Sequence, residues 1–209
     1  MKNIRLIVSF MSILNQFCLV NRDNLLSDGT RESDSDHTFK LCFLAMLLLP
    51  YLKTPVDALK IHQMALIHDI AEAQTKDFSY AVTASDKQVR AQKKKAEQKA
   101  ITEYAGRLPS PVGQQIFDLW QEYEARQTRE AQIVYALDRM EATLQSNFYK
   151  GGVAYWGQCP NGQFYYENAV KTHPYVQDLK EEILNDLEQA VVQISKQNIQ
   201  KMNAAKTRA

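Results

Sequence analysis

The chain has 209 residues, a length typical of one domain with additional elements. Lysine and arginine total 25 against 24 for aspartate and glutamate, so the formal net charge is +1. This excludes a protein whose overall positive charge attracts nucleic acid or anionic membranes. Hydrophobic residues make up 45% of the chain, with 7 glycines and 6 prolines, which excludes disordered, collagen-like and low-complexity classes and favours long helices.

The cysteines and the most apolar segment indicate the cellular compartment of the protein. Cys18, Cys42 and Cys159 are odd in number and widely spaced, which favours a reducing environment over a disulfide framework or a zinc ribbon. The apolar stretch 41–49 ends at Pro50 and is well short of the ~20 residues that a bilayer span requires. We therefore expect a cytoplasmic protein in which this stretch is a buried helix.

The N-terminal segment predicts an amphipathic helix. Its apolar side chains share one helical stripe: Ile4, Ile7, Val8, Met11 and Leu14. Lys2 and Arg5 before a short apolar run also resemble the start of a secretory signal, but no small-residue cleavage site follows. We prefer the helix.

A polar segment rich in turn formers, 21–35, then predicts a long loop of the kind that often carries function. The second helix should begin with Ser35 or Asp36 as N-cap, include His37, and end before Pro50. Because its residues are apolar on all sides, we expect it to be central.

A third helix should begin with Thr54 as N-cap, followed by Pro55, and run to about Ala73. Four residues supply its apolar positions: Leu59, Ala65, Leu66 and Ile70. The next helix, at about 85–104, is rich in lysine, including Lys93, Lys94 and Lys95, and predicts a solvated face.

The rest of the chain is predicted to be mostly helical. A break at 109–111 precedes a helix through 116–123, and a further helix covers about 128–147 and contains Asp138. An aromatic-rich insertion follows at about 150–174, and a final amphipathic helix at about 175–202. No internal repeat or glycine-rich phosphate loop is present, so a Rossmann or P-loop enzyme is not expected.

Three polar residues stand together near the end of the third helix. His68 and Asp69 are adjacent, and Glu72 follows one turn later on the same side. Burying this cluster without compensation would be costly, so it must be exposed, paired, or bound to a cation. The simplest alternative to a functional site is a salt-bridged helix end at the surface.

The order of these residues along the chain resembles a known family. The segments Arg31–His37 and Ala65–Glu72, then Asp77, then Ala136–Arg139 are similar to the HD-domain metal-dependent phosphohydrolases, and most similar to their 5′-deoxynucleotidase branch. The resemblance covers about 5–150. It implies an all-α HD-domain helical bundle for this core. With the aromatic insertion and the extra C-terminal helix predicted above, we expect a single domain over 1–209.

Carried over residue by residue, the resemblance implies roles for individual side chains. Four residues are expected to ligate one divalent metal ion: His37, His68, Asp69 and Asp138. Two imidazoles and two carboxylates suit Mn, Fe, Co, Ni, Zn or Mg, so the identity of the metal stays open. Glu72 is expected to orient or deprotonate the attacking water, and Asp77 to position water or substrate.

Two basic residues are candidates for substrate binding. Arg22 lies fifteen residues before His37, where the nucleotidases place an arginine that contacts the nucleotide, and its guanidinium suits a phosphate. Lys40 lies one turn after His37 and could add positive potential. For Arg22 the alternative is an exposed loop arginine, whereas for Lys40 a solvated lysine is the preferred interpretation. His62 and His173 are interpreted as structural and loop residues.

The chain departs from the branch at two positions. Asp23 stands where an aromatic residue is usual, which leaves sugar discrimination open, and Lys76 stands where glycine is usual before Asp77. The Tyr155-Trp156 pair could stack on a base, although such aromatics more often anchor a loop.

We therefore expect an enzyme that hydrolyses nucleoside or deoxynucleoside 5′-monophosphates with one divalent metal and an activated water. The relatives also suggest a homodimer. Alternatives are a hydrolase of a signalling nucleotide or another small phosphate ester, and an inactive HD module that binds a metal or ligand. Nucleic-acid binding through 93–95 is the weakest alternative, because one short basic run does not form a phosphate-tracking surface.

Overall fold

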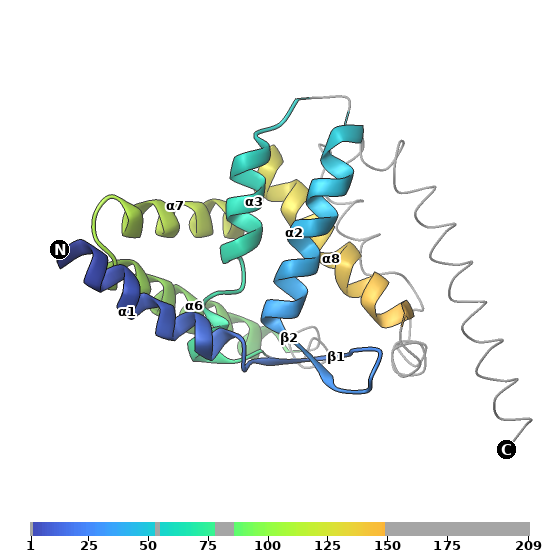
Figure 1. Cartoon of the computed structure of the whole chain (residues 1–209), viewed down its shortest axis with the longest axis horizontal. Coiled ribbons are helices and arrows are strands. Elements are labelled where there is room, and N and C mark those ends of the chain that lie inside the picture. Colours follow the sequence, from blue (N-terminus) through green and yellow to red (C-terminus); the bar gives the residue numbers. More distant parts are fainter. Residues whose placement is uncertain (1, 53–54, 78–85, 149–209) are drawn as a thin grey trace, which may run out of the picture.

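The computed structural model describes residues 2–52, 55–77 and 86–148, and these form a helical bundle with one small antiparallel sheet (Figure 1). The elements are α1 (Lys2–Phe17), β1 (Asn21–Leu25), β2 (Arg31–Ser33), α2 (Asp34–Leu48), the 3-10 turn η1 (Leu49–Tyr51), α3 (Ala58–Ile67), α4 (Glu72–Thr75), α6 (Lys87–Arg107), α7 (Val112–Ala125) and α8 (Arg129–Phe148). The predicted insertion at 150–174 and the C-terminal helix at 175–202 lie outside the described residues, as do Thr54 and His173.

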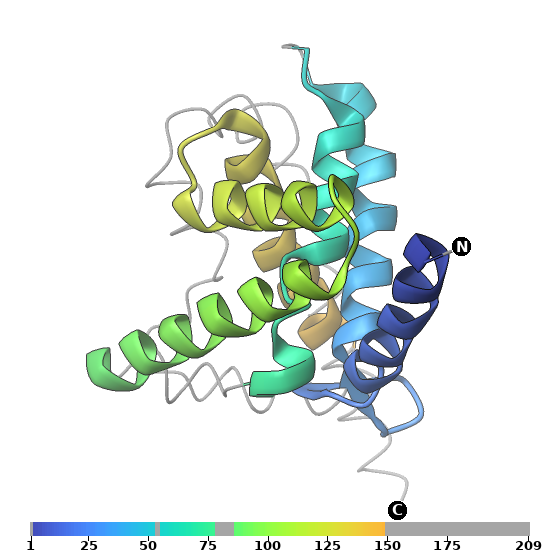
Figure 2. The ribbon, with the colours of Figure 1, turned by 90° about the vertical axis from the view of Figure 1, so that its left-hand side faces the viewer.

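Two apolar clusters hold the bundle together. One lies among α2, α3, α7 and α8, with Leu41, Ile61 and Leu137 fully or almost fully buried. The other joins α1, α4, α6 and α7 around Tyr104 and Trp120. Helix α7 contributes to both clusters, since it contacts α6 as well as α3 and α8, and Figure 2 shows it above α6. The all-α prediction is confirmed.

Helix α1 is confirmed, but of the predicted stripe only Leu14 packs against the core, as a partly buried side chain. Ile13 and Phe17 are buried and pack against α4 and α6, with Phe10 edge-on to the ring of Tyr104. Three residues of the predicted stripe are more than half exposed: Ile4, Val8 and Met11. Two apolar faces were available to this helix, and the buried one carries the aromatic side chains Phe10 and Phe17, which offer large apolar surfaces.

The predicted loop at 21–35 is wrong, because most of it forms the hairpin of β1 and β2. Asn21 pairs with Ser33 and Leu25 with Arg31, and the strands are joined at Gly29, whose φ of 92° suits glycine. Several inward-facing side chains of these strands are polar, because they contact the charged groups described below. The sequence therefore lacks the alternation of apolar and polar residues that indicates a half-buried strand.

The N-cap of α2 lies two or three residues earlier than predicted, since Ser35 or Asp36 was expected. Ser33 is the N-cap, and its side chain and that of Asp36 exchange hydrogen bonds with each other's backbone N–H in a capping box. This cap places His37 in the first turn. The expectation of a central helix is wrong for one face, on which four large apolar residues are about half exposed or more: Phe39, Phe43, Met46 and Leu47.

Helix α3 is capped by Asp57 and ends at Ile67, rather than starting at Thr54 and reaching Ala73 as predicted. The helix is interrupted at His68, and a short turn leads into α4. Ala65 and Ile70 are buried as expected, whereas Leu59 and Leu66 are exposed. In this turn and at the start of α4, His68, Ile70, Ala71 and Glu72 are buried, and Asp69 is partly buried.

The three later helices agree with the prediction within a few residues. Helices α6 and α7 approach closely at Gly113, where an added Cβ would lie 2.2 Å from the carbonyl oxygen of Ala105, so only glycine fits there. Within the described part of the chain, none of the helices has both the length and the apolar character needed to cross a membrane.

Candidate active site

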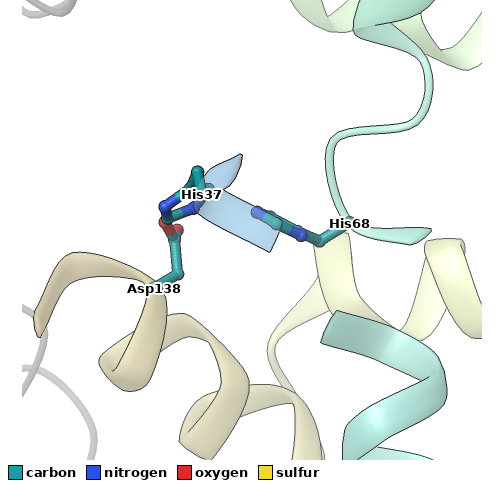
Figure 3. Close-up of side chains that lie close together, drawn as sticks. All are labelled: His37, His68 and Asp138. Carbon is teal, nitrogen blue, oxygen red and sulfur yellow. The ribbon is translucent and has the colours of Figure 1, made fainter. Parts of the chain in front are cut away.

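Side chains from three separate elements meet in the centre of the bundle. His37 comes from the first turn of α2, His68 from the residue after α3, and Asp138 from the middle of α8, and all three are buried (Figure 3). One ligand atom of each lies within 4.8 Å of the other two. Two imidazoles and a carboxylate that converge in this way could hold a metal ion.

His68 is prepared to act as a ligand. Its Nδ1–H donates to the carbonyl oxygen of Ala65 at 2.8 Å, which leaves the lone pair on Nε2. That buried Nε2 has no hydrogen-bond partner, although it lies 3.0 Å from Oδ2 of Asp69. A buried acceptor without a donor is costly unless a cation lies beside it, so this atom fits a metal site.

Asp138 is held as an anion. Its Oδ1 lies 3.1 Å from Nε2 of His37, and its Oδ2 accepts from the hydroxyl of Tyr123 at 3.2 Å. Burial opposes ionisation, but Arg139, whose Nη2 is 3.1 Å from Oδ2, and the bond to His37 keep the pKa of Asp138 well below its ordinary value. A negative oxygen is therefore available beside the two imidazoles.

The other nitrogen of His37 is anchored to Glu141. Nδ1–H donates to Oε2 of Glu141 at 2.5 Å, and both side chains are buried. Burial and Arg22 favour the neutral imidazole, yet the hydrogen bonds with Asp138 and Glu141 raise the pKa of His37 to about 9. Asp138 and Glu141 thus stabilise a positive charge at the imidazole of His37, which is the property expected of a cation site. A carboxylate on the outer nitrogen also fixes the orientation of a ligating imidazole.

Lys40 belongs to this outer layer. Its ammonium contacts Glu32, lies 3.2 Å from Oε1 of Glu141, and donates to Oε1 of Gln145 at 2.6 Å. The expectation that Lys40 is a solvated lysine is not met, because its side chain is 30% exposed and engaged with three partners. Binding of substrate by Lys40 stays a prediction.

A second group of acids adjoins the first. Carboxylate oxygens of Asp34, Asp69 and Glu72 lie within 4.8 Å of one another, and Oδ2 of Asp34 and Oε2 of Glu72 have no hydrogen-bond partner. Burial and the charge of Asp69 raise the pKa of Glu72 well above its ordinary value and that of Asp34 to about 6. The pKa of Asp69 moves the other way: burial opposes ionisation, but His68, when its Nε2 carries a proton, and Arg22 outweigh it. Glu72 is thus a stronger base than an exposed carboxylate.

Arg22 extends from β1 into this acidic group. Its Nη1 lies 3.2 Å from Oδ2 of Asp69 and 3.3 Å from Oδ1 of Asp34, and Nε lies 3.6 Å from Glu32. Its side chain is 15% exposed, so the alternative of an exposed loop arginine does not hold. A guanidinium at the edge of the metal cluster is well placed for an anionic substrate group.

Asp77 lies just after α4, half-buried, where burial raises its pKa against the charges of Arg22 and Lys93. The residue before it, Lys76, has φ 67° and ψ 159°, a conformation that is normal only for glycine. This strain accounts physically for the usual glycine at that position. His62 is outside the cluster, and its Nδ1 bonds to the carbonyl oxygen of Ala58 in its own helix.

Four residues at the site were missed by sequence reasoning: Asp34, Lys93, Tyr123 and Glu141. Glu141 lies three residues after Asp138 on the same helix face, a spacing that could have indicated it. Lys93 donates to Oε1 of Glu72 at 2.8 Å, and Lys94 pairs with Glu124 at 3.7 Å, so the predicted basic run does not form one free surface. No local signal marked Asp34 or Tyr123.

Comparisons with known proteins agree with this geometry. The family profile of the HD domain matches residues 15–180. The chain is 34% identical over 150 residues to 5′-deoxynucleotidase HDDC2 of Dictyostelium discoideum, covering 68% of this chain and 77% of that protein. It is 28% identical to 5′-deoxynucleotidase HDDC2 of Xenopus laevis, covering 90% of each.

Solved structures agree as well. A predicted metal-dependent phosphohydrolase of Magnetospirillum magnetotacticum MS-1 superimposes with a TM-score of 0.69 at 26% identity, covering 95% of this chain and 93% of that one. An HD-domain phosphohydrolase of Listeria innocua shares the fold, with a TM-score of 0.64, 18% identity, and coverage of 93% and 99%.

The helical bundle and its buried cluster of histidines and acids therefore define a metal-dependent phosphohydrolase. More specifically, the chain belongs to the HD-domain family.

Proposed function

We propose that this enzyme hydrolyses nucleoside 5′-monophosphates, ribo or deoxy, to a nucleoside and inorganic phosphate. The observation that carries the proposal is the buried cluster of His37, His68 and Asp138, with the bare Nε2 of His68 aimed into it. Relatives named 5′-deoxynucleotidase support the choice of a nucleotide monoester as substrate.

Four residues would hold one divalent cation: His37, His68, Asp69 and Asp138. When bound, such a cation polarises a phosphoryl oxygen and makes water more acidic. The mixed set of nitrogen and oxygen donors, with two imidazoles, fits this role better than a closed structural zinc site does.

Glu72 would accept the proton of the attacking water. Its raised pKa makes Glu72 a stronger proton acceptor than an exposed carboxylate, and its Oε2 has no hydrogen-bond partner. The water oxygen bonds to phosphorus, the bond to the 5′ oxygen breaks, and the nucleoside leaves as an alcohol after taking up a proton. Asp77, at the rim, would position water or substrate.

Arg22 would bind the phosphate of the substrate. Its Nη1 now bridges Asp34 and Asp69, and an arriving phosphate offers the same guanidinium a stronger anionic partner. We assign Lys40 to the support of Glu141 and His37, because its ammonium is engaged with Glu32, Glu141 and Gln145.

Phosphate release tests this function. Metal-stripped protein is resupplied with Mn, Co, Mg or Zn and assayed on a panel of ribo- and deoxyribonucleoside monophosphates. We expect metal-dependent release that is lost in Asp69→Ala and reduced by about 10²–10⁴ in Glu72→Ala. Absence of release with every metal and every monophosphate would overturn the substrate class, and the same panel extended to other small phosphate esters would identify the alternative.

We also propose that the protein is cytoplasmic and forms a homodimer. Free thiols at Cys18 and Cys42 are consistent with a reducing compartment. The exposed apolar face of α2 supports self-association. Light scattering on the purified protein measures the oligomeric state, and a monomer at all concentrations would contradict the dimer.

A further inference from the structure

Lys93 lies on α6, in a helix whose charge pattern predicts a solvated face, but its ammonium points into the candidate active site. Nζ donates to Oε1 of Glu72 at 2.8 Å and lies 3.4 Å from Oε1 of Glu97. Its side chain is 21% exposed, against 64% for the neighbouring Lys94 and 76% for Lys99. Lys93 is therefore distinguished from other lysines of the same helix by its burial and its partner.

The contact divides the carboxylate of Glu72 into two unlike oxygens. Oε1 is bound to Lys93, whereas Oε2 is buried without a hydrogen-bond partner. A carboxylate oxygen of Glu72 lies within 4.8 Å of carboxylate oxygens of Asp34 and Asp69. A carboxylate with one oxygen anchored cannot rotate freely about its last bond. Lys93 thereby restrains the carboxylate of Glu72 beside Asp34 and Asp69.

Glu97 holds Lys93 in turn. It is four residues further along α6, is only 15% exposed, and completes a row of charges from Glu97 through Lys93 to Glu72 across the contact between α6 and α4. Burial lowers the pKa of Lys93, but the two acids outweigh it and raise that pKa above its ordinary value. Lys93 is therefore a permanent cation with a restrained side chain.

We propose that Lys93 is a positioning residue that orients Glu72 for its role as general base. The role rests on the proposed function, because it acts through Glu72 and has no chemistry of its own. Its consequence is a specific kinetic signature: loss of Lys93 should lower kcat and leave KM nearly unchanged, since binding of the phosphate is assigned to Arg22.

The central experiment compares Lys93→Met with Lys94→Met, a matched change one residue away on the exposed part of the same helix. With a nucleoside monophosphate as substrate, we expect Lys93→Met to lower kcat by about 10- to 100-fold with KM within about threefold of the wild type. Lys93→Arg, which keeps the charge, should recover most of the rate. Lys94→Met should behave as the wild type.

A double-mutant cycle separates positioning from an independent effect. In the Glu72→Gln background, Lys93→Met should cause little further loss of rate, because the residue through which it acts is already removed. An equal loss in both backgrounds would overturn the proposal, and so would a rise in KM with unchanged kcat, which would mean that Lys93 binds substrate directly.

A second cycle does not depend on activity. The free energy of unfolding of the metal-free protein, measured with denaturant, should fall more on Lys93→Met in the wild type than in Glu72→Gln, because only the former strands a buried carboxylate. Failure of the wild type to hydrolyse any phosphate ester would overturn the proposed function. Absence of coupling in unfolding would overturn the contact between Lys93 and Glu72 itself.

Discussion

His37 illustrates how one side chain is specialised by its neighbours. Its Nδ1 is fixed by Glu141 at 2.5 Å, and its Nε2 faces Asp138 at 3.1 Å. Glu141 is in turn compensated by Lys40 at 3.2 Å. The imidazole has therefore little freedom to turn away, and a metal that replaces the proton on Nε2 finds its ligand already oriented.

Of the site residues, Arg22 is the one whose replacement should change substrate binding most directly. We expect Arg22→Ala to raise KM by about 10- to 100-fold, since it removes charge-assisted hydrogen bonds to the phosphate, and Arg22→Lys to be intermediate because an ammonium lacks the planar fork. Steady-state kinetics measure both. Arg31→Ala, in the same hairpin but 59% exposed, is the control. An unchanged KM in Arg22→Ala would remove Arg22 from substrate binding.

The site was partly predictable from the sequence for a physical reason. His68, Asp69 and Glu72 are close in the chain, so their proximity in space follows from local geometry, and the resemblance supplied His37 and Asp138. Lys93 and Glu141 act through contacts between helices. In the sequence they cannot be told apart from lysines and glutamates that are exposed to solvent. Only tertiary packing distinguishes a lysine such as Lys93 from a surface one.

The connection after α3 carries three residues of the candidate site: His68, Asp69 and Glu72. A continuous helix to Ala73, as the apolar periodicity predicts, would also place these three on one side. The chain instead breaks after Ile67, and the turn that leads into α4 buries His68, Ile70, Ala71 and Glu72. The sequence pattern could not indicate this break, because no glycine or proline marks it.

The end of α4 carries local strain at Lys76. We expect Lys76→Gly to raise the free energy of unfolding by about 1 kcal/mol, because only glycine adopts φ 67° and ψ 159° without steric cost. Lys94→Gly, inside helix α6, should lower it by about 1 kcal/mol. Denaturant titration measures both variants. A loss of stability in Lys76→Gly comparable to that in Lys94→Gly would contradict the assigned strain.

Helix α1 and the hairpin limit what hydrophobic patterns can predict. The first has two apolar faces, and the burial of Phe17 rather than Val8 depends on what α4 and α6 present to it. The hairpin carries Arg22 and Glu32 inward, so its sequence reads as a loop. In both cases the deciding partners are distant in the chain.

A cation at the cluster would connect elements that are far apart in the sequence. His37, His68 and Asp138 come from α2, the end of α3 and α8, and a shared ligand would add a cross-link among them. A metal that binds the folded state alone stabilises it by about 2.7 kcal/mol at a hundredfold excess over its Kd.

We therefore expect chelation to lower Tm by about 5–10 °C and resupply of the metal to restore it. Differential scanning calorimetry measures the shift. His68→Ala, which removes the bare nitrogen of the cluster, should show a Tm that responds little to chelator or metal. An equal response in His68→Ala and the wild type would place the stabilising metal elsewhere in the protein.

The most direct test of the account is the position of the metal itself. Anomalous diffraction from crystals loaded with Mn²⁺ should give a peak within about 2.0–2.4 Å of ligand atoms from His37, His68, Asp69 and Asp138. Such a peak would establish the centre around which Glu72, Arg22 and Lys93 are arranged. A protein that takes up Mn²⁺ but shows no peak at these four residues would contradict the proposed site.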